Sequence, residues 1–145
     1  MIKKKTSTAT VNWDHTGVKT VADIGGYQVV YGSGNPNKGD GPTPVGMLLS
    51  SLGACLTQII ASMAAKRRIE ITDIQVRVEG DMDLEGIINR ASGIRTGVQE
   101  IRYHVTVDSP APREEILKLI EQAELLCPVK DTLQLGSLLI NTSDL

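Results

Sequence analysis

Aromatic side chains are scarce in this chain of 145 residues, which has no phenylalanine, one tryptophan and three tyrosines. Stacking platforms for bases or sugars are therefore not expected, and the core must be aliphatic. A basic excess is lacking as well, because 15 lysines and arginines stand against 17 aspartates and glutamates. A net charge of -2 is not the electrostatic pattern of a DNA- or RNA-binding protein. We expect no nucleic-acid partner.

A secretory signal is also missing, since the N-terminal lysines of MIKKKTSTATVNW are followed by a polar stretch and not by an apolar one. We therefore expect a cytoplasmic protein. Its two cysteines are too few for a disulfide-stapled scaffold, and a reducing compartment would keep them as thiols unless their chemistry is the function. Hydrophobic residues make up 41% and charged residues 22%, so residues 1–145 are predicted to form a single globular domain.

The first third of the chain reads as short strands. Residues 8–13, 18–24 and 27–31 are predicted to form an antiparallel meander, because only Gly25-Gly26 separates the second strand from the third. The following segment, residues 32–43, holds four glycines and two prolines (GSGNPNKGDGPT) and is predicted to be a loop.

A long helix is predicted next, with Thr43 as N-cap and Pro44 at the first helical position. Residues 45–65 carry no charge, so a membrane span has to be weighed. Five polar side chains and two glycines dilute this stretch, and no other segment resembles a span. We therefore interpret it as a buried central helix, covered by a sheet on one side and by something else, such as a partner subunit, on the other.

The rest of the chain alternates between strand and helix patterns. Residues 73–82 and 98–107 show the period-two alternation of half-buried strands, and the stretch between them reads as a mobile, irregular excursion. Residues 109–126 have helical spacing of apolar side chains. A short helical piece at 128–133 and a last strand at 137–141 complete the prediction of an α+β fold.

The two cysteines are the candidate site residues. Cys55 lies in the middle of the apolar helix, where it fills the core or reacts. Cys127 precedes Pro128, which places it at a helix N-cap, and Lys130 is nearby. Both features favour the thiolate, so the residues alone point to Cys127 as the more reactive thiol, although a buried structural thiol fits the same position.

The sequence resembles the osmotically inducible protein C and organic hydroperoxide resistance (OsmC/Ohr) family over nearly its whole length. The resemblance rests on a glycine-rich loop leading into PVGMLLSSLGAC, on DIQVRVEGDMD, on VQEIRYHVTVDSPAPREEILKLIEQAE and on LLCPVKDTL. It implies an α+β domain whose antiparallel sheet packs on the long central helix, in an intertwined homodimer.

The resemblance further implies a thiol peroxidase acting on organic hydroperoxides in oxidative or osmotic stress defence. Cys55 matches the peroxide-attacking cysteine and Cys127 the resolving cysteine, which together form a disulfide that an external dithiol reduces. No cofactor, metal site or membrane partner is expected.

The chain departs from the family pattern in its activating charges. Active members carry an arginine in the N-terminal strands and, in the hydroperoxide-resistance branch, a glutamate in the central helix, but residues 1–66 here contain neither residue type. Lys19, Arg90 or Arg95 are the candidate replacements. The alternative hypothesis is a non-enzymatic dimer of the same fold that binds a small hydrophobic ligand.

Overall fold

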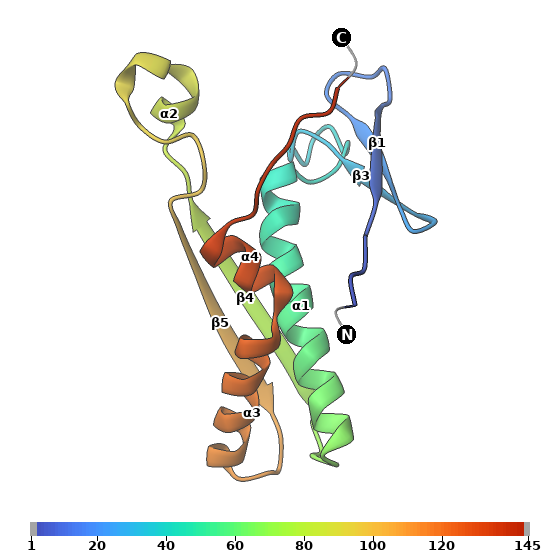
Figure 1. Cartoon of the computed structure of the whole chain (residues 1–145), viewed down its shortest axis with the longest axis vertical. Coiled ribbons are helices and arrows are strands. Elements are labelled where there is room, and N and C mark those ends of the chain that lie inside the picture. Colours follow the sequence, from blue (N-terminus) through green and yellow to red (C-terminus); the bar gives the residue numbers. More distant parts are fainter. Residues whose placement is uncertain (1–2, 144–145) are drawn as a thin grey trace. The chain divides into compact units, whose positions relative to one another are not determined.

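A computed structural model describes residues 3–143 of the chain, which divides into two compact units (Figure 1). One unit runs up to Leu48 and the other begins at Leu49, so the boundary falls inside one continuous helix. Each unit contains its own antiparallel sheet, with three strands in the first unit and two in the second.

The first unit is built on the predicted meander of β1 (Ala9–Trp13), β2 (Thr20–Ile24) and β3 (Tyr27–Tyr31). The turn between β2 and β3 is Gly25-Gly26, with φ angles of 59° and 91°. Two successive positive φ angles suit glycine and match the twist of a two-residue hairpin. This turn sets the register, which places Ile24 opposite Tyr27.

The segment after β3 is a loop, as predicted, and hydrogen bonds close it on itself. The Gly32 N–H donates to the Pro42 carbonyl at 2.8 Å. The Asp40 carboxylate accepts from the backbone N–H and from the hydroxyl of Ser33, each at 2.9 Å. These bonds hold the pKa of Asp40 below its ordinary value, and the bond from the Ser33 backbone N–H contributes most. The glycine-rich loop is therefore ordered by its own polar groups.

Helix α1 (Pro44–Lys66) begins at the predicted residue, where the Thr43 hydroxyl accepts the Gly46 N–H at 3.0 Å. Among the described residues it is the one helix long and apolar enough to cross a membrane by length and composition, a test that core helices of soluble proteins also pass.

Burial of α1 is confined to one stripe of side chains. This stripe recurs every four residues from Leu52 to Ala64, whereas Ala54, Gln58 and Ala61 on another face are exposed. The sheet and the C-terminal helices of the second unit cover this one side of the helix. The predicted cover of its other side, such as a partner subunit, stays a prediction.

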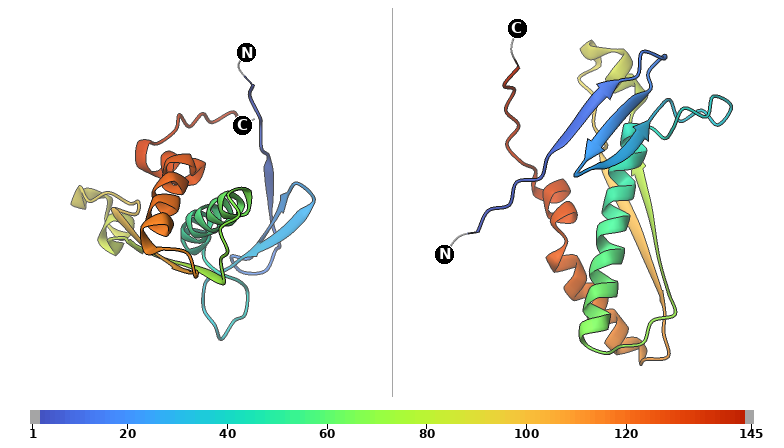
Figure 2. Two further views of the ribbon diagram at one scale, coloured as in Figure 1. Left: turned by 90° about the horizontal axis from the view of Figure 1, so that it is seen from below. Right: turned by 90° about the vertical axis from the view of Figure 1, so that its right-hand side faces the viewer.

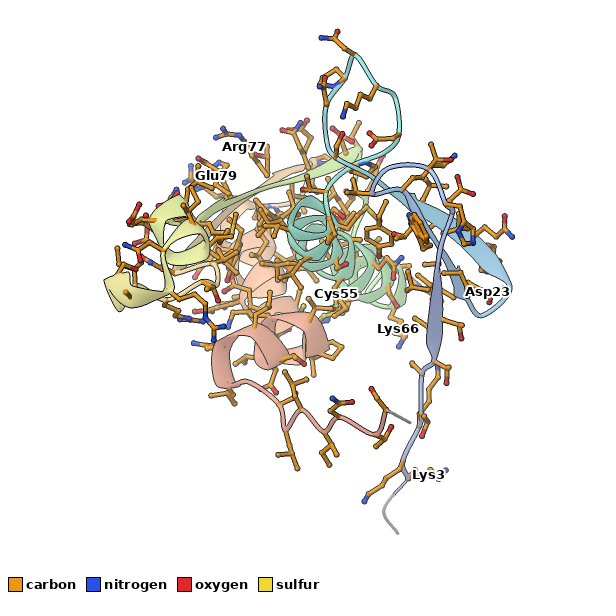
Figure 3. All side chains as sticks on the ribbon, turned by 90° about the horizontal axis from the view of Figure 1, so that it is seen from above. Lys3, Asp23, Cys55, Lys66, Arg77 and Glu79 are labelled. Atoms are coloured by element: carbon orange, nitrogen blue, oxygen red, sulfur yellow. The ribbon has the colours of Figure 1, made fainter. Side chains whose placement is uncertain are left out.

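The second unit contains the hairpin of β4 (Asp73–Asp81) and β5 (Glu100–Asp108), paired in register from Asp73 opposite Asp108 to Asp81 opposite Glu100. Its side chains alternate between a half-buried apolar face and an exposed charged face, as predicted. Arg77 and Glu79 lie on the exposed face (Figure 3) and form an ion pair at 2.9 Å.

Helices α1 and α3 (Arg113–Leu126) lie on the same side of this hairpin (Figure 2). Ile60 and Ala64 of α1 form a buried cluster with the α3 residues Ile116, Leu119 and Ala123. Apolar side chains of β4 and β5 pack against this cluster and close it from the sheet side.

The excursion between β4 and β5 is not irregular, which corrects the prediction. It contains α2 (Leu84–Ile88) and a single 3₁₀ turn, η1 (Arg90–Ser92). The Asp83 side chain caps α2 by accepting the Glu85 N–H at 2.9 Å. Within this segment a Cβ added to Gly86 would lie 2.5 Å from the Arg95 carbonyl oxygen, so the close backbone approach needs glycine.

Helix α4 (Pro128–Leu135) follows α3 after a single residue, Cys127, which ends one helix and caps the next. The predicted strand at 137–141 is wrong, because this segment has no regular structure and its side chains at Leu138, Leu139 and Ile140 are largely exposed. In the part of the chain that the structure describes, no strand pairs with it.

Candidate active site

The structure brings the two cysteines together inside the second unit. Cys55 lies on α1 and is half-buried, whereas Cys127 is only 1% exposed. Cys127 forms a buried cluster with Leu52 and Leu56, which lie one helical turn apart on α1, and Cys55 packs against that cluster. Figure 3 shows Cys55 on the part of α1 that faces the C-terminal helices. The segments that carry the two thiols are distant in sequence and adjacent in space.

The Cys55 thiol lies near enough to Cys127 for the second thiol to influence its pKa. Burial raises the pKa of the Cys55 thiol, and the hydrogen bond with Cys127 raises it further, because a thiolate at Cys55 would lose solvation and face a second sulfur. A hydrogen bond from the backbone N–H of Val129 acts in the opposite direction and lowers this pKa. Both cysteines are free thiols.

The N-terminus of α4 faces both sulfur atoms. The Lys130 backbone N–H donates to Cys127 Sγ at 3.3 Å, and the preceding N–H, of Val129, donates to Cys55. Pro128 at the first helical position favours this arrangement, because it starts the helix directly after the cysteine. Free N–H groups at a helix N-terminus carry partial positive charge and stabilise a thiolate.

A cavity of about 600 Å³ opens beside this cluster, within the second unit. Four residues that line the cavity also belong to the cluster of Leu52, Leu56 and Cys127 or pack against it: Leu52, Ile101, Tyr103 and Leu133. Its polar lining includes Arg95, Glu124 and Lys130. The cavity therefore places charged groups and solvent next to the apolar cluster that contains Cys127.

Tyr103 and Glu124 form a polar pair in the wall of this cavity. The Tyr103 hydroxyl donates to Glu124 Oε2 at 2.8 Å. Burial raises the pKa of Tyr103 to about 12, with further contributions from Glu124 and then from the sulfur of Cys127. The phenol therefore stays protonated near neutral pH. Sequence reasoning missed this pair, because the two residues are 21 positions apart and carry no motif.

The candidate replacements for the family arginine differ in their surroundings. Lys19, in the first unit, lies 3.5 Å from the Asp14 carboxylate and so has an ion-pair partner. Arg95, in the second unit, lines the cavity beside the Cys127 cluster. Arg90 lies in η1 and is exposed. Of the three, Arg95 is the one that shares a cavity with residues packed against a cysteine.

No metal centre is apparent among residues 3–143, where groups of three or more His, Cys, Asp or Glu side chains with suitable spacing are lacking. The chemistry that this geometry can support is that of two adjacent thiols, one half-buried and one buried, at the N-terminus of a helix.

Comparison with known proteins identifies a family and relatives with the same fold. The family of OsmC-like proteins matches residues 37–141. A hydroperoxide reductase of Mycoplasma genitalium is 28% identical over 133 residues, which cover 92% of this chain and 89% of that protein. The crystal structure of an OsmC-like protein from Mycoplasma pneumoniae is 26% identical, with a TM-score of 0.77 over 91% of this chain and 89% of that one.

The organic hydroperoxide resistance protein OhrB of Bacillus subtilis shares the fold at 21% identity, with a TM-score of 0.55 over 88% of this chain and 90% of that one. Fold and site together define a small α+β protein with a pair of adjacent thiols. The chain belongs to the OsmC-like family, as its sequence motifs indicated.

Proposed function

We propose that the protein is a thiol-dependent peroxidase that reduces organic hydroperoxides with Cys55 and Cys127. The observation that carries this proposal is the proximity of the two thiols, which α1 and the junction of α3 and α4 bring to one apolar cluster. A chain that only filled its core with sulfur would not need both cysteines at the same helix N-terminus. The relative from Mycoplasma genitalium, named a hydroperoxide reductase, supports the same reaction class.

The proposed reaction has three steps. The Cys55 thiolate attacks the terminal peroxide oxygen, the O–O bond breaks, and Cys55 becomes a sulfenic acid. The alkoxide that leaves takes a proton from solvent and becomes the alcohol. Cys127 then attacks the Cys55 sulfur, a disulfide forms, and the hydroxyl group leaves as water. An external dithiol attacks the disulfide and returns both cysteines to thiols while it becomes oxidised itself.

Cys55 is the better candidate for the attacking thiol because it is half-buried, whereas Cys127 is almost fully buried. A hydroperoxide approaching from solvent meets the more accessible sulfur first. The apolar neighbours Leu52 and Ile59 suit the organic part of such a peroxide. This assignment reverses the order of reactivity that the sequence position of Cys127 favours, and it agrees with the roles that the family resemblance implies.

The N–H groups of α4 serve in place of the side-chain activation that the chain lacks. The Val129 N–H lowers the pKa of Cys55, but burial and the neighbouring Cys127 still raise this pKa above its ordinary value. Only a small fraction of Cys55 is therefore thiolate at neutral pH. We infer a slow peroxidase whose rate increases with pH.

The protein is proposed to act as an intertwined cytoplasmic homodimer. The exposed face of α1 carries no charge between Pro44 and Ala65, and burying such a face against a second copy requires no charge to be desolvated. Light scattering at micromolar concentration is expected to give the dimer mass, and Ala61→Glu on this face is expected to give monomer. A stable wild-type monomer would contradict this part of the proposal.

The competing function is a dimer that binds a small hydrophobic ligand without chemistry. The absence of arginine and glutamate from residues 1–66 favours it. One equivalent of cumene hydroperoxide added to the reduced protein separates the two functions. Peroxidase chemistry predicts a mass loss of about 2 Da and one linked peptide pair, because sulfenate and thiol condense to a disulfide.

Single variants assign the roles of the cysteines. Cys127→Ser is expected to stop at a sulfenic acid that dimedone traps on Cys55, and Cys55→Ser to leave Cys127 largely unreacted. The reverse pattern would exchange the two roles. If the peroxide oxidises neither thiol even above pH 8.5, the pKa of about 8.5 at which free cysteine becomes thiolate, the ligand-binding function is the correct one.

A further inference from the structure

Neither cysteine lines the cavity of about 600 Å³ in the second unit, so the composition of its wall needs an explanation apart from the thiols. The wall is formed by α1, by β5 and the segment before it, and by α3 and α4. Its volume lies in the range of about 300–1,000 Å³ that is usual for sites of small organic ligands. The side chains that line it indicate the kind of ligand that would fit.

The cavity wall carries charges of both signs that do not pair with each other. Arg95 and Lys130 are cationic and Glu124 is anionic, yet none of the three belongs to an ion pair formed among residues 3–143. The opposite charges are therefore held apart on the wall of one cavity. A ligand that carries both a negative and a positive group can contact them at the same time.

The two cationic side chains have donors available for an anion. No hydrogen bond of the Arg95 guanidinium is found within the described part of the chain, and the Lys130 ammonium group donates one, to Gln134 Oε1 at 3.1 Å. A guanidinium has five N–H donors in a planar fork that matches a carboxylate, and an ammonium group has three. Arg95 is exposed and Lys130 half-buried, so a carboxylate that enters from solvent meets Arg95 first.

The carboxylate of Glu124 has one oxygen available for a cation. Its Oε2 accepts the Tyr103 hydroxyl at 2.8 Å, which holds the carboxylate in the wall, whereas Oε1 has no hydrogen-bond donor among the described residues. Glu124 is half-buried, and a charge-assisted hydrogen bond becomes stronger where water is partly excluded. An ammonium group is the ligand group that matches this oxygen.

Apolar side chains line the rest of the cavity and select the body of the ligand. They come from three different elements and are all buried or half-buried: Leu52, Val98, Ile101 and Leu133. An aliphatic group that packs on them leaves water, which favours binding by about 1.5–3 kcal/mol for a side chain of the size of leucine. A small inorganic ion would leave this surface unused.

We propose that this cavity binds a small zwitterion with an aliphatic body. Its carboxylate contacts Arg95 and Lys130, its ammonium group contacts Glu124 Oε1, and its aliphatic part packs on Leu52 and Val98. Free aliphatic amino acids and short apolar peptides share this chemistry. No covalent bond is made or broken and neither thiol takes part, so this binding function is additional to the proposed peroxidase function and does not rest on it.

Calorimetric titration of the reduced full-length protein, without peroxide, tests the ligand class. Leucine and leucyl-leucine are the two zwitterions, and the tighter binder of the two distinguishes an amino acid from a peptide. Three probes each lack one feature of leucine: 4-methylpentanoate lacks the ammonium group, 3-methylbutylamine lacks the carboxylate, and glycine lacks the aliphatic body.

At least one zwitterion is expected to bind to one site per chain with a dissociation constant of about 1 mM or lower. Each of the three probes should bind at least about tenfold more weakly, because each lacks a charged hydrogen bond or the apolar contact. Binding of both zwitterions that is weaker than this, or a probe that binds as tightly as the better zwitterion, would overturn the proposal.

Two charge-removing variants place the ligand in this cavity. Arg95→Gln removes the cation without an ion-pair partner, and Glu124→Gln removes the anion but leaves an oxygen that accepts the Tyr103 hydroxyl. Arg90→Gln in η1 and Glu121→Gln on α3 are matched controls, because both side chains are exposed and neither lines the cavity. Urea unfolding midpoints near that of the wild type verify that all four variants are folded.

Both site variants should bind the better zwitterion at least about tenfold more weakly than the wild type, as expected for the loss of a charged hydrogen bond. The two controls should stay within about twofold of the wild type. Wild-type affinity in either site variant, or equal losses in the controls, would contradict this location of the ligand and overturn the proposal. A protein that binds the zwitterion as expected but does not react with hydroperoxide would overturn only the peroxidase function.

Discussion

Replacing Gly53 by alanine tests how closely α1 approaches the sheet beside the candidate site. Gly53 is buried two residues before Cys55, and glycine inside a helix is usually taken to permit close backbone contact. A Cβ built at Gly53 would lie 3.5 Å from Val78 Cγ2 and 3.6 Å from the Val76 carbonyl oxygen. These are ordinary van der Waals distances, so the added methyl group fits without displacing the strand.

The expected result is stabilisation. Alanine favours a helix interior over glycine by about 1 kcal/mol, and the methyl group adds buried apolar contact. With a urea m-value of roughly 1–3 kcal/mol per molar, the midpoint of unfolding should rise by about 0.3–1 M. Urea titration followed by circular dichroism at one fixed protein concentration measures this change. The rate at which Cys55 reacts with hydroperoxide should stay near the wild-type value.

Gly80→Ala is the matched comparison on β4. Its Cβ would lie 2.9 Å from Val98 Cγ1 and 3.1 Å from Leu49 Cδ2, which is too close without movement of both side chains. This variant should lose about 1–3 kcal/mol, as overpacked cores do. If Gly53→Ala instead loses as much as Gly80→Ala, helix and strand are closer than the structure places them, and the reasoning is refuted.

Three further predictions concern the cysteines and the outer face of the hairpin. Cys127→Ala should unfold at a lower urea concentration than Cys127→Ser, because serine can still accept the Lys130 N–H and loss of such a cap costs about 1 kcal/mol. Equal urea midpoints of the two variants would show that the cap contributes nothing. Alkylation of Cys55 by iodoacetamide should rise with pH and level off above the free-cysteine value of about 8.5, because its pKa is raised, first by burial; a plateau below pH 8 would contradict the assignment. Asp81→Asn removes the carboxylate that Arg102 Nη1 contacts at 2.7 Å. Any decrease in the urea midpoint of this variant at 50 mM salt should vanish at 1 M salt, because salt screens an exposed ion pair.

The periodic parts of the fold could be predicted from the sequence. The charge-free run with Pro44 at its start predicted α1, and strict alternation predicted β4 and β5, because these patterns record which side chains face the core. The tail at 137–141 was predicted as a strand from β-prone residues alone. A strand also needs a neighbouring strand for its hydrogen bonds, and the sequence of a local segment does not show whether one is present.

The candidate site could be predicted only in part. The two cysteines stood out because thiols are rare and chemically distinctive, and the family motifs paired them. Tyr103 and Glu124 could not be found in this way, because their hydrogen bond depends on how α3 packs on β5 and neither residue is unusual for its element. The helix α2 left a local signal that was overlooked, namely Asp83 as its N-cap.

Because the two thiols are close in space but far apart in the sequence, a disulfide between them would couple redox state to folding. A disulfide between Cys55 and Cys127 would close a loop of 127 − 55 = 72 residues around most of the second unit. In the chain-entropy view a loop of that size stabilises a fold by about 4 kcal/mol. The oxidised protein would then resist unfolding and proteolysis better than the reduced one. Thermodynamic linkage makes the converse true, so variants that weaken the folded state would also make the disulfide easier to reduce.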